Sequence, residues 1–208
     1  MARKAKRTKQ PATPEDARDR LIDAAMALAA EIGWDGIGMK EVAGAASVDL
    51  ADALAQFPDK HSLLREFTRR IDAAVLAGGG AVDPAETPRD RLFEVLMRRF
   101  DALSPHKPAI RRIARVLYRD PFAAACQVAR LTAAMALMLE CAGIDSTGVC
   151  GRLRVKGLAL VYGAALKTWL ADDSPDQAAT MAALDRALMR AERLAGMLWP
   201  AAETAPAN

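Results

Sequence analysis

The chain has 208 residues and a mass of 22.3 kDa; 52% of its residues are hydrophobic and 26% are charged. This balance excludes a chain that is disordered throughout, because enough apolar surface is present to form a sizeable core. Aromatic residues make up only 5%. Alanine, leucine, methionine and arginine, which favour helices, outnumber the β-branched residues that favour sheets, so we predict an all-α fold.

No stretch of the sequence is long and apolar enough for a membrane-spanning helix, since the longest uncharged runs are about ten residues and a bilayer requires roughly 20. The basic first ten residues are not followed by an apolar segment, so they do not resemble a secretory signal. Cys126, Cys141 and Cys150 form no paired motif and are expected as thiols in a reducing compartment. We therefore predict a cytoplasmic protein without an integral membrane segment.

The net charge of +3 is unevenly distributed along the chain. Residues 1–20 carry seven basic and three acidic side chains, whereas the remainder carries 22 basic and 23 acidic ones. The excess positive charge is thus confined to the start of the chain. Such an arm can contact nucleic-acid phosphates or an anionic membrane surface, or it can be a solvated, disordered leader.

Apolar residues at helical spacing, bounded by prolines, glycines and capping residues, predict helices in two groups. The first group is expected over residues 14–32, 39–46, 49–56 and 59–76. The second group is expected over residues 87–103, 108–118, 120–142, 147–171 and 174–198. The glycine-rich segment between the groups matches no phosphate-binding motif and is expected to be a linker. The predicted organisation is a basic disordered arm at 1–13, a domain at 14–77, a larger helical domain at 87–199 and a disordered tail at 200–208.

Capping residues mark several of the expected helix starts. Asp59 can cap the fourth helix, and Thr87, followed by a proline, can cap the fifth. Ser174 and Gln177 have the spacing of a capping box, so we expect Ser174 to begin the last helix. The acidic pair 172–173 is expected to lie in solvent at the end of the preceding helix.

One segment of the first domain carries a specific pattern of residues. It contains Gly33, Trp34, Asp35, Gly36, Met39, Lys40, Glu41, Val42, Ala43, Ala46, Val48, Phe57, Pro58, Asp59, Lys60, Leu63 and Leu64. Over about 45 residues without a gap, this pattern resembles the N-terminal helix-turn-helix domain of TetR-family transcriptional regulators. The resemblance implies that Val42, Ala43 and Phe57 are core residues and that Lys60 meets a DNA phosphate. It also implies about nine helices, a C-terminal ligand-binding domain and a twofold dimer.

The expected recognition helix departs from the family pattern. Ser47 stands in the turn where the family usually has glycine, and Leu54 stands where the family usually has tyrosine. Gln56 is the only side chain on the helix of a type that reads base edges in the major groove.

Acidic side chains on the same helix are unfavourable for DNA binding. Asp49 and Asp52 would repel phosphates, although Asp49 is also suited to be the helix N-cap. Residues 33–60 hold five acidic and two basic side chains. We therefore expect weak DNA binding, or binding that depends on the basic arm. The candidate DNA-binding residues are Lys40, Gln56, Lys60, Arg3, Lys4, Lys6 and Arg7.

A second resemblance lies near the C-terminus. It is carried by Trp169, Leu170, Ala171, Asp172, Asp173, Ser174, Pro175, Asp176, Thr180, Leu184, Asp185 and Arg186. These residues resemble the C-terminal signature of the lipid-binding accessory proteins of ubiquinone biosynthesis, which have a TetR-like fold. That resemblance implies lipid and enzyme partners in place of DNA.

The larger domain holds apolar side chains that suit a pocket for a hydrophobic small molecule or lipid. The same helical spacing is also that of an ordinary packed core, and both interpretations remain open. The candidate lining residues are Phe122, Leu131, Met135, Met138, Leu139, Leu158, Tyr162 and Trp169. The two last helices are expected to form a homodimer interface, because Gly157, Gly163 and Ala164 on the first of them let helices approach closely. Ordinary packing within one chain is the other interpretation of these small residues.

The sequence does not favour an enzyme. His61 and His106 are the only histidines and have no partner ligand at metal spacing, and no nucleophile motif is present. We therefore predict no metal, no cofactor and no catalytic residue. The leading hypothesis is a ligand-responsive TetR-like regulator, a repressor that binds DNA as a dimer. The alternative is a lipid- or isoprenoid-binding accessory protein of ubiquinone biosynthesis that has the same fold and has lost DNA binding.

Overall fold

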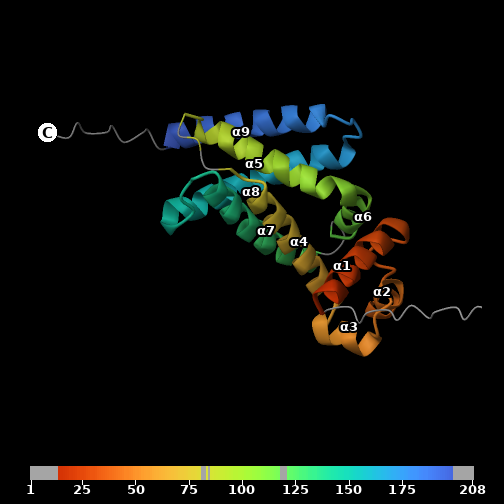
Figure 1. The fold of residues 1–208 in the computed structure, drawn as a ribbon. Helices are drawn as coiled ribbons and strands as arrows, with labels where there is room; N and C mark the ends of the chain where they lie inside the picture. Colours follow the sequence, from red (N-terminus) through yellow and green to blue (C-terminus); the bar gives the residue numbers. More distant parts are fainter. Residues whose placement is uncertain (1–13, 81–82, 84, 118–120, 199–208) are drawn as a thin grey trace, which may run out of the picture.

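A computed structural model describes residues 14–80, 83, 85–117 and 121–198, with only the backbone described at 14, 117, 121–128 and 195–198. In this part of the chain the protein is entirely helical, with nine α-helices, one short 3-10 helix and no strand (Figure 1). The prediction of an all-α fold is confirmed. The helices are α1 (Pro14–Glu31), α2 (Met39–Ala46), α3 (Leu50–Gln56), α4 (Lys60–Ala77), α5 (Pro88–Leu103), η1 (Ser104–His106), α6 (Lys107–Leu117), α7 (Pro121–Cys141), α8 (Gly148–Ala171) and α9 (Ala178–Leu198).

Helices α1, α2 and α3, with the first half of α4, form a small module at one end of the molecule (Figure 1). Its core is apolar because each helix turns one hydrophobic face inward. Val42, Ala43, Phe57 and Leu63 are all buried, which confirms their prediction as core residues. The guanidinium carbon of Arg18 lies 4.8 Å from the centre of the Phe57 ring, so a cation covers the aromatic plug of this core.

Helices α5, α7, α8 and α9 form the larger body of the protein, in which α8 packs against both α7 and α9. The aromatic ring of Phe100 on α5 stacks at 5.2 Å on Tyr162 and at 5.6 Å on Trp169, both from α8. These three large side chains are buried and join α5 firmly to α8.

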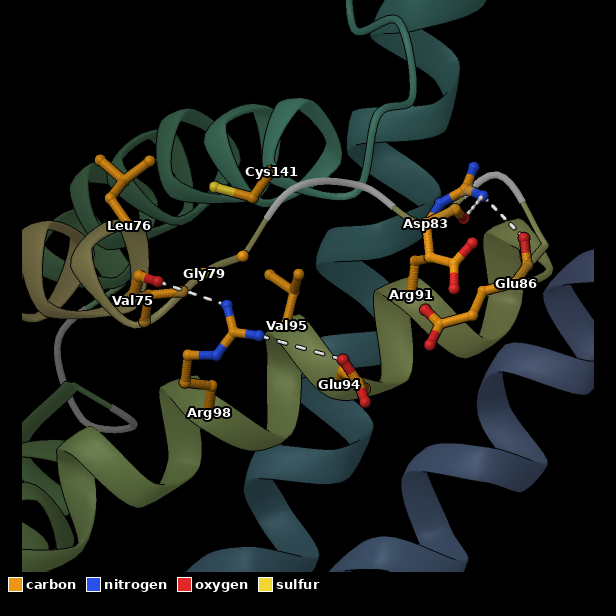
Figure 2. Close-up of a pocket in the computed structure, with 11 residues that line it drawn as sticks. Val75, Leu76, Gly79, Asp83, Glu86, Arg91, Glu94, Val95, Arg98 and Cys141 are labelled. Atoms are coloured by element: carbon orange, nitrogen blue, oxygen red, sulfur yellow. Dashed lines mark hydrogen bonds and ion pairs between the residues drawn. The ribbon is translucent and has the colours of Figure 1, made fainter.

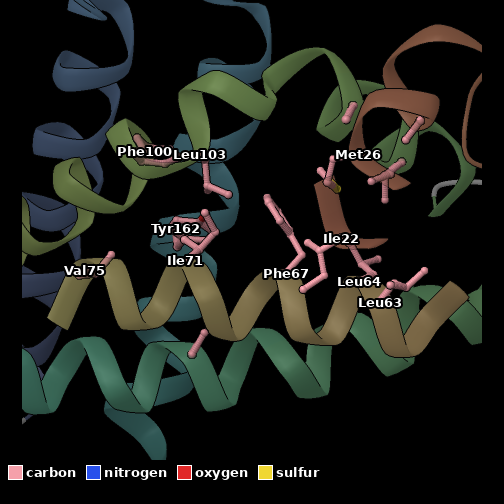
Figure 3. Packing of buried hydrophobic residues seen from close by; sticks show 14 of the residues in the cluster. Ile22, Met26, Leu63, Leu64, Phe67, Ile71, Val75, Phe100, Leu103 and Tyr162 are labelled. Carbon is pink, nitrogen blue, oxygen red and sulfur yellow. The ribbon is translucent and has the colours of Figure 1, made fainter. Parts of the chain in front are cut away.

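Helix α4 belongs to both parts of the molecule. Leu63, Leu64 and Phe67 on its first turns pack into the small module, and Ile71 and Val75 further along pack into the body (Figure 3). Helix α6 and η1 also contact α1. The buried hydrophobic residues consequently form one continuous cluster, and α4 contributes side chains to it in both parts.

Side-chain caps mark the starts of α3, α4 and α5. Asp49 accepts a hydrogen bond from the backbone N–H of Ala51 at 2.9 Å, and Asp59 accepts one from that of Ser62 at 2.7 Å. Thr87 accepts one from the backbone N–H of Asp90 at 3.2 Å. The predicted caps at these three positions are therefore confirmed.

The predicted start of the last helix at Ser174 is wrong. Helix α9 begins at Ala178, after Gln177 takes a left-handed conformation with φ of 53°. The Ser174 hydroxyl donates to the carboxylate of Asp172 and does not accept from the first turn of the helix. The capping box fails because a nearby acceptor binds the hydroxyl.

Among the described residues, no helix combines the length and apolar composition that crossing a bilayer requires. In the same residues, no three histidine, cysteine, aspartate or glutamate side chains cluster in a way that could hold a metal ion.

Candidate nucleic-acid interface

The turn between α2 and α3 is built on Ser47, the position where the resemblance led us to expect glycine. Ser47 adopts a left-handed conformation, with φ of 53° and ψ of 44°, and its N–H donates to the carbonyl of Gly44 at 3.2 Å. The N–H of Val48 donates to the carbonyl of Ala43 at 3.0 Å and closes the end of α2. The backbone thus makes the turn that a glycine would make, although a serine must bear the steric strain of this conformation.

Helix α3 presents most of its surface to solvent. Ala53 is its one residue classed as buried, whereas Leu50 and Leu54 are 39% and 42% exposed. The exposed face also carries Asp52, so it joins apolar side chains to an acidic one and offers no cation. A helix held on one side by the module and open on the other has the placement that a recognition helix requires.

Lys60 makes contacts within the module. Its ammonium donates to the carbonyl oxygens of Trp34 at 2.8 Å and Ile37 at 3.2 Å, and it lies 5.6 Å from the centre of the Trp34 ring. An ammonium has three N–H donors, so these two carbonyls leave one of them unused. The side chain therefore fastens α4 to the α1–α2 connection, a role that the resemblance did not indicate.

A groove of about 440 Å³ runs between α1 and α3. Gln56 lines it, and the side-chain oxygen of Gln56 is buried without a hydrogen-bond partner among the described residues. Lys40 is exposed on α2. The groove is also lined by Arg20, Ser47, Asp49, Asp52 and Ala55.

The other four predicted DNA-binding residues, Arg3, Lys4, Lys6 and Arg7, lie outside the described residues. Within the described part, the surface formed by α2 and α3 has Lys40 as its one exposed cation, against three exposed carboxylates at Glu41, Asp49 and Asp52. This surface is therefore poorly suited to attract phosphates, as the sequence indicated.

The predicted ligand-pocket residues in the body lie mostly within the packed core. Met135, Met138 and Trp169 have essentially no exposed surface, and Leu139, Leu158 and Tyr162 are also buried. Leu131 is half-buried, and the side chain of Phe122 lies outside the described residues. Two cavities among the described residues, one beside α3 and one at the end of α4, are lined by other residues.

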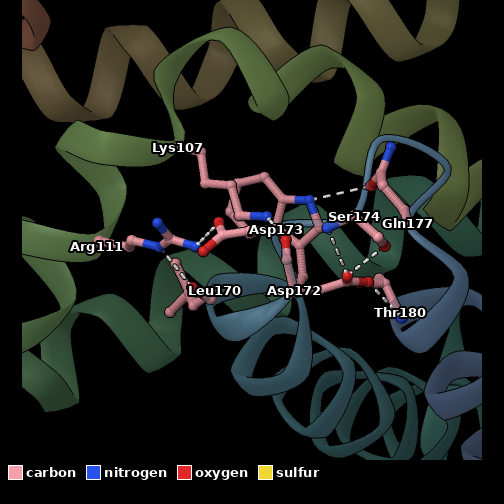
Figure 4. Close-up of polar contacts among 9 residues, drawn as sticks. Lys107, Arg111, Leu170, Asp172, Asp173, Ser174, Gln177 and Thr180 are labelled. Carbon is pink, nitrogen blue, oxygen red and sulfur yellow. Dashed lines mark hydrogen bonds and ion pairs between the residues drawn. The ribbon is translucent and has the colours of Figure 1, made fainter.

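The expectation that Asp172 lies in solvent is wrong. Its carboxylate is buried and accepts hydrogen bonds from the N–H and hydroxyl of Ser174, and from the N–H and hydroxyl of Thr180 at 2.9 and 2.7 Å (Figure 4). These bonds, those of Ser174 first and those of Thr180 next, hold the pKa of the Asp172 carboxyl well below its usual range. The ammonium of Lys107 on α6 donates to the backbone carbonyl of the same residue. Asp172 thus ties the α8–α9 connection together and links it to α6.

A buried ion pair between α4 and α5 was not predicted. The guanidinium of Arg99 binds the carboxylate of Asp72, and the Arg99 side chain is buried. One signal was present in the sequence, because Arg99 lies on the apolar face of its helix, between Leu96 and Leu103. A charge at such a position requires a buried partner.

The fold of this chain is similar to the folds of several solved structures. A TetR transcriptional regulator from Nitrosomonas europaea matches with a TM-score of 0.70 at 22% identity, covering 85% of this chain and 98% of that chain. A TetR transcriptional regulator from Rhodococcus sp. RHA1 matches with a TM-score of 0.61 at 21% identity, covering 87% and 97%. A TetR-family regulator from Syntrophomonas wolfei, described as putative, matches with a TM-score of 0.61 at 13% identity, covering 91% and 99%.

No family model matches the chain. No curated protein matches it either. The structural matches extend over both the small module and the body, and they cover almost the full length of each matched protein. This chain therefore has the fold of the TetR-family transcriptional regulators.

Proposed function

We propose that this protein is a TetR-like transcriptional regulator, a repressor that binds DNA as a homodimer and releases it when a small molecule binds the body. The observation that carries the proposal is the open face of α3, held outward at the end of the module while α1 and α2 support it from behind. A recognition helix must have this placement to enter a major groove. Such a regulator would act in the cytoplasm.

The module of this regulator offers few side chains that can donate hydrogen bonds to DNA. Lys40 and Gln56 are the side chains of α2 and α3 that can donate to DNA, and Lys60 has one donor left. We infer that Arg3, Lys4, Lys6 and Arg7 supply most of the phosphate contacts, because neutralising phosphates provides much of the affinity of such proteins. DNA binding should then depend on the arm more than on the module.

The homodimer would form through α8 and α9. Helix α8 carries exposed apolar side chains along its length, including Leu153 and Leu160, the latter 77% exposed. Gly157 and Gly163 leave open space where a side chain would stand, so a second helix can approach closely at both positions. Exposed apolar surface of this kind is typical of a face that a partner covers.

The side chains predicted to line a pocket for a hydrophobic small molecule or a lipid are mostly packed in the core, as the stacking of Tyr162 and Trp169 on Phe100 illustrates. This packing gives no support to a lipid-binding accessory protein. It also means that the effector of the proposed regulator requires a different site in the body.

Selection from random-sequence duplex DNA at low salt, with the full chain as bait, tests the proposal. Fluorescence anisotropy then measures the affinity of the chain for each selected sequence. We expect sites with two inverted half-sites, since a twofold dimer reads both. Deleting residues 2–9 should weaken binding at least about tenfold at moderate salt. Asp52→Asn should strengthen it, because a carboxylate that repels phosphates is removed.

Arg115→Ala, at an exposed position on α6 and outside the proposed dimer helices, is the control and should leave DNA affinity unchanged. Failure to enrich any sequence would overturn the proposed function. Enrichment followed by equal affinity of the arm-deleted chain would overturn the role of the arm alone.

A further inference from the structure

A cleft of about 270 Å³ lies where the end of α4 meets α5, α7 and the connection that follows α4 (Figure 2). Val75, Leu76 and Val95 form its apolar wall, and Arg91, Glu94 and Arg98 bring charged groups to it. None of these residues was singled out in the sequence. The volume lies just below the range of typical pockets for drug-sized molecules, so the cleft suits a smaller ligand.

The two arginines of the cleft differ in their freedom to bind a ligand. Arg91 donates to the backbone carbonyls of Ala142 at 2.8 Å, Glu86 at 2.7 Å and Asp83 at 3.3 Å, and so holds the connection in place. Arg98 has weaker partners: its Nη1 donates to the carbonyl of Val75 at 3.4 Å, and its Nη2 lies 4.0 Å from a carboxylate oxygen of Glu94. Several of the five N–H donors of Arg98 therefore remain for another acceptor.

Positive and negative groups occupy different depths of the cleft. The Arg98 side chain is 28% exposed, whereas that of Glu94 is 62% exposed, so the cation lies deeper and the carboxylate nearer the rim. Asp83 and Glu86 add two exposed carboxylates near the mouth. A simple anion would be repelled at the rim, and a simple cation would be repelled by Arg98. A molecule that carries both charges satisfies both positions.

We propose that this cleft binds a small zwitterion of the α-amino-acid type with an apolar side chain. Its carboxylate binds Arg98, its ammonium binds Glu94 at the rim, and its side chain packs on Val75, Leu76 and Val95. Arg98 and Glu94 are close enough for one amino acid to reach both, because their side chains lie 4.0 Å apart. The cleft is then the effector site, and this regulatory role rests on the proposed function.

Arg98 connects the cleft to the helix that carries the DNA-binding module. A Cβ atom at Gly78 would lie 3.0 Å from Cδ of Arg98, and one at Gly79 would lie 3.1 Å from its Nη1, so the side chain lies directly on the end of α4. A ligand carboxylate that draws Arg98 away from the Val75 carbonyl removes one of the contacts that fix this end. Because α4 packs into both parts of the molecule, its shift changes the position of α3.

Isothermal titration of the full chain without DNA tests the binding site itself. The probes are L-leucine, L-methionine and L-phenylalanine, together with N-acetyl-L-leucine, which lacks the ammonium, and L-leucinamide, which lacks the carboxylate. We expect at least one amino acid to bind, and both leucine derivatives to bind at least about tenfold more weakly than leucine. The proposal would be overturned if either derivative bound as tightly as leucine, or if none of the three amino acids bound.

Matched variants locate the site. Arg98→Gln and Glu94→Gln should each weaken amino-acid binding about tenfold or more, whereas Arg112→Gln and Glu31→Gln, at exposed positions outside the cleft, should leave it unchanged. Glu94 is largely exposed, so its variant remains informative if the arginine variant folds poorly. Equal binding by the native chain and the Glu94→Gln variant would contradict the assignment of the ammonium site.

Anisotropy with a selected DNA then tests regulation separately. The amino acid that binds should lower the DNA affinity of the native chain and leave that of Arg98→Gln unchanged. Binding without any effect on DNA would retain the site and overturn its regulatory role. Absence of DNA binding altogether would overturn the proposed function, while the titration would still decide the zwitterion site.

Discussion

The guanidinium of Arg99 binds the carboxylate of Asp72 inside the protein, where α5 meets α4. The two side chains are 5% and 17% exposed. The guanidinium carbon also lies 5.7 Å from the centre of the Tyr162 ring, and burial raises the pKa of that tyrosine, with the charge of Arg99 acting in the opposite direction. Among the described residues, Asp72 is the carboxylate that pairs with this charge, and the Nε atom of Arg99 is buried without a hydrogen-bond partner.

Asp72→Ala should therefore destabilise the protein strongly. Removing one partner of a buried ion pair leaves the other charge uncompensated and costs about 3–5 kcal/mol. Denaturant unfolding of the full chain measures the loss. Asp23→Ala is the matched control, because Asp23 pairs with Arg70 on the surface, where the loss should be below about 1 kcal/mol. Similar losses for the two variants would contradict the importance of the buried pair.

Ser47→Gly should stabilise the protein. A left-handed conformation costs an L-residue about 1–2 kcal/mol, and the greater freedom of glycine in the unfolded chain offsets part of this gain. A net gain of about 0.5–1 kcal/mol is expected, with the DNA-binding face unchanged. Ala45→Gly, on the exposed side of α2, should instead cost about 1 kcal/mol. A loss of stability in Ser47→Gly would show that the serine side chain has a stabilising role of its own.

Thr180→Val should destabilise the connection between α8 and α9. The variant keeps the shape of the side chain and removes the hydroxyl that donates to Asp172 at 2.7 Å, which costs about 1–3 kcal/mol at neutral pH. Because folding lowers the pKa of Asp172, its stabilising contribution is present above the ordinary value of 3.8 and is lost as the pH falls below it. The difference in unfolding free energy between native and variant chains should shrink on acidification. Thr180→Ser keeps the hydroxyl, so its unfolding free energy should depend on pH as that of the native chain does.

His106 should make the stability depend on pH near neutrality. The imidazole lies in an edge-to-face contact with Phe67 at 4.9 Å. Burial first, and the charge of Arg70 next, lower its pKa from the ordinary 6.5, while Asp23 acts in the opposite direction. The neutral form is therefore favoured by folding, and its stabilising contribution is present above pH 6.5 and declines as the pH falls toward the lower folded value.

Unfolding of the His106→Gln variant at several pH values checks this expectation. The decline in stability just below pH 6.5 should be smaller in this variant than in the native chain. His61→Gln, at an exposed position on α4, is the control and should keep the native decline. An unchanged pH profile in His106→Gln would contradict the assignment to this histidine.

The features that the sequence predicted well depend on residues close together in the chain. Asp49, Asp59 and Thr87 act as caps because each accepts a hydrogen bond from a residue two or three positions later. The helix-turn-helix module was recognisable for the same reason, since its core positions recur at local helical spacing. Ser174 failed as a cap because Asp172, two residues earlier, competes for its hydroxyl.

The features that were missed depend on residues far apart in the chain. The carbonyls that hold Lys60 lie 26 and 23 positions earlier, and Asp72 lies 27 positions from Arg99. Periodicity can place Arg99 on an apolar face, but it cannot name the helix that faces it. The cleft beside Arg98 likewise exists only because three helices and a connection meet there.

The exposed apolar side chains of α8 have a thermodynamic consequence for the proposed homodimer. Surface such as that of Leu160 is removed from water only when two chains associate. Part of the free energy that stabilises the folded chain therefore depends on the protein concentration. The thermal midpoint would then rise with protein concentration. Dilution would lower the fraction of paired chains and the folded fraction together, which makes the abundance of such a protein a determinant of its own lifetime.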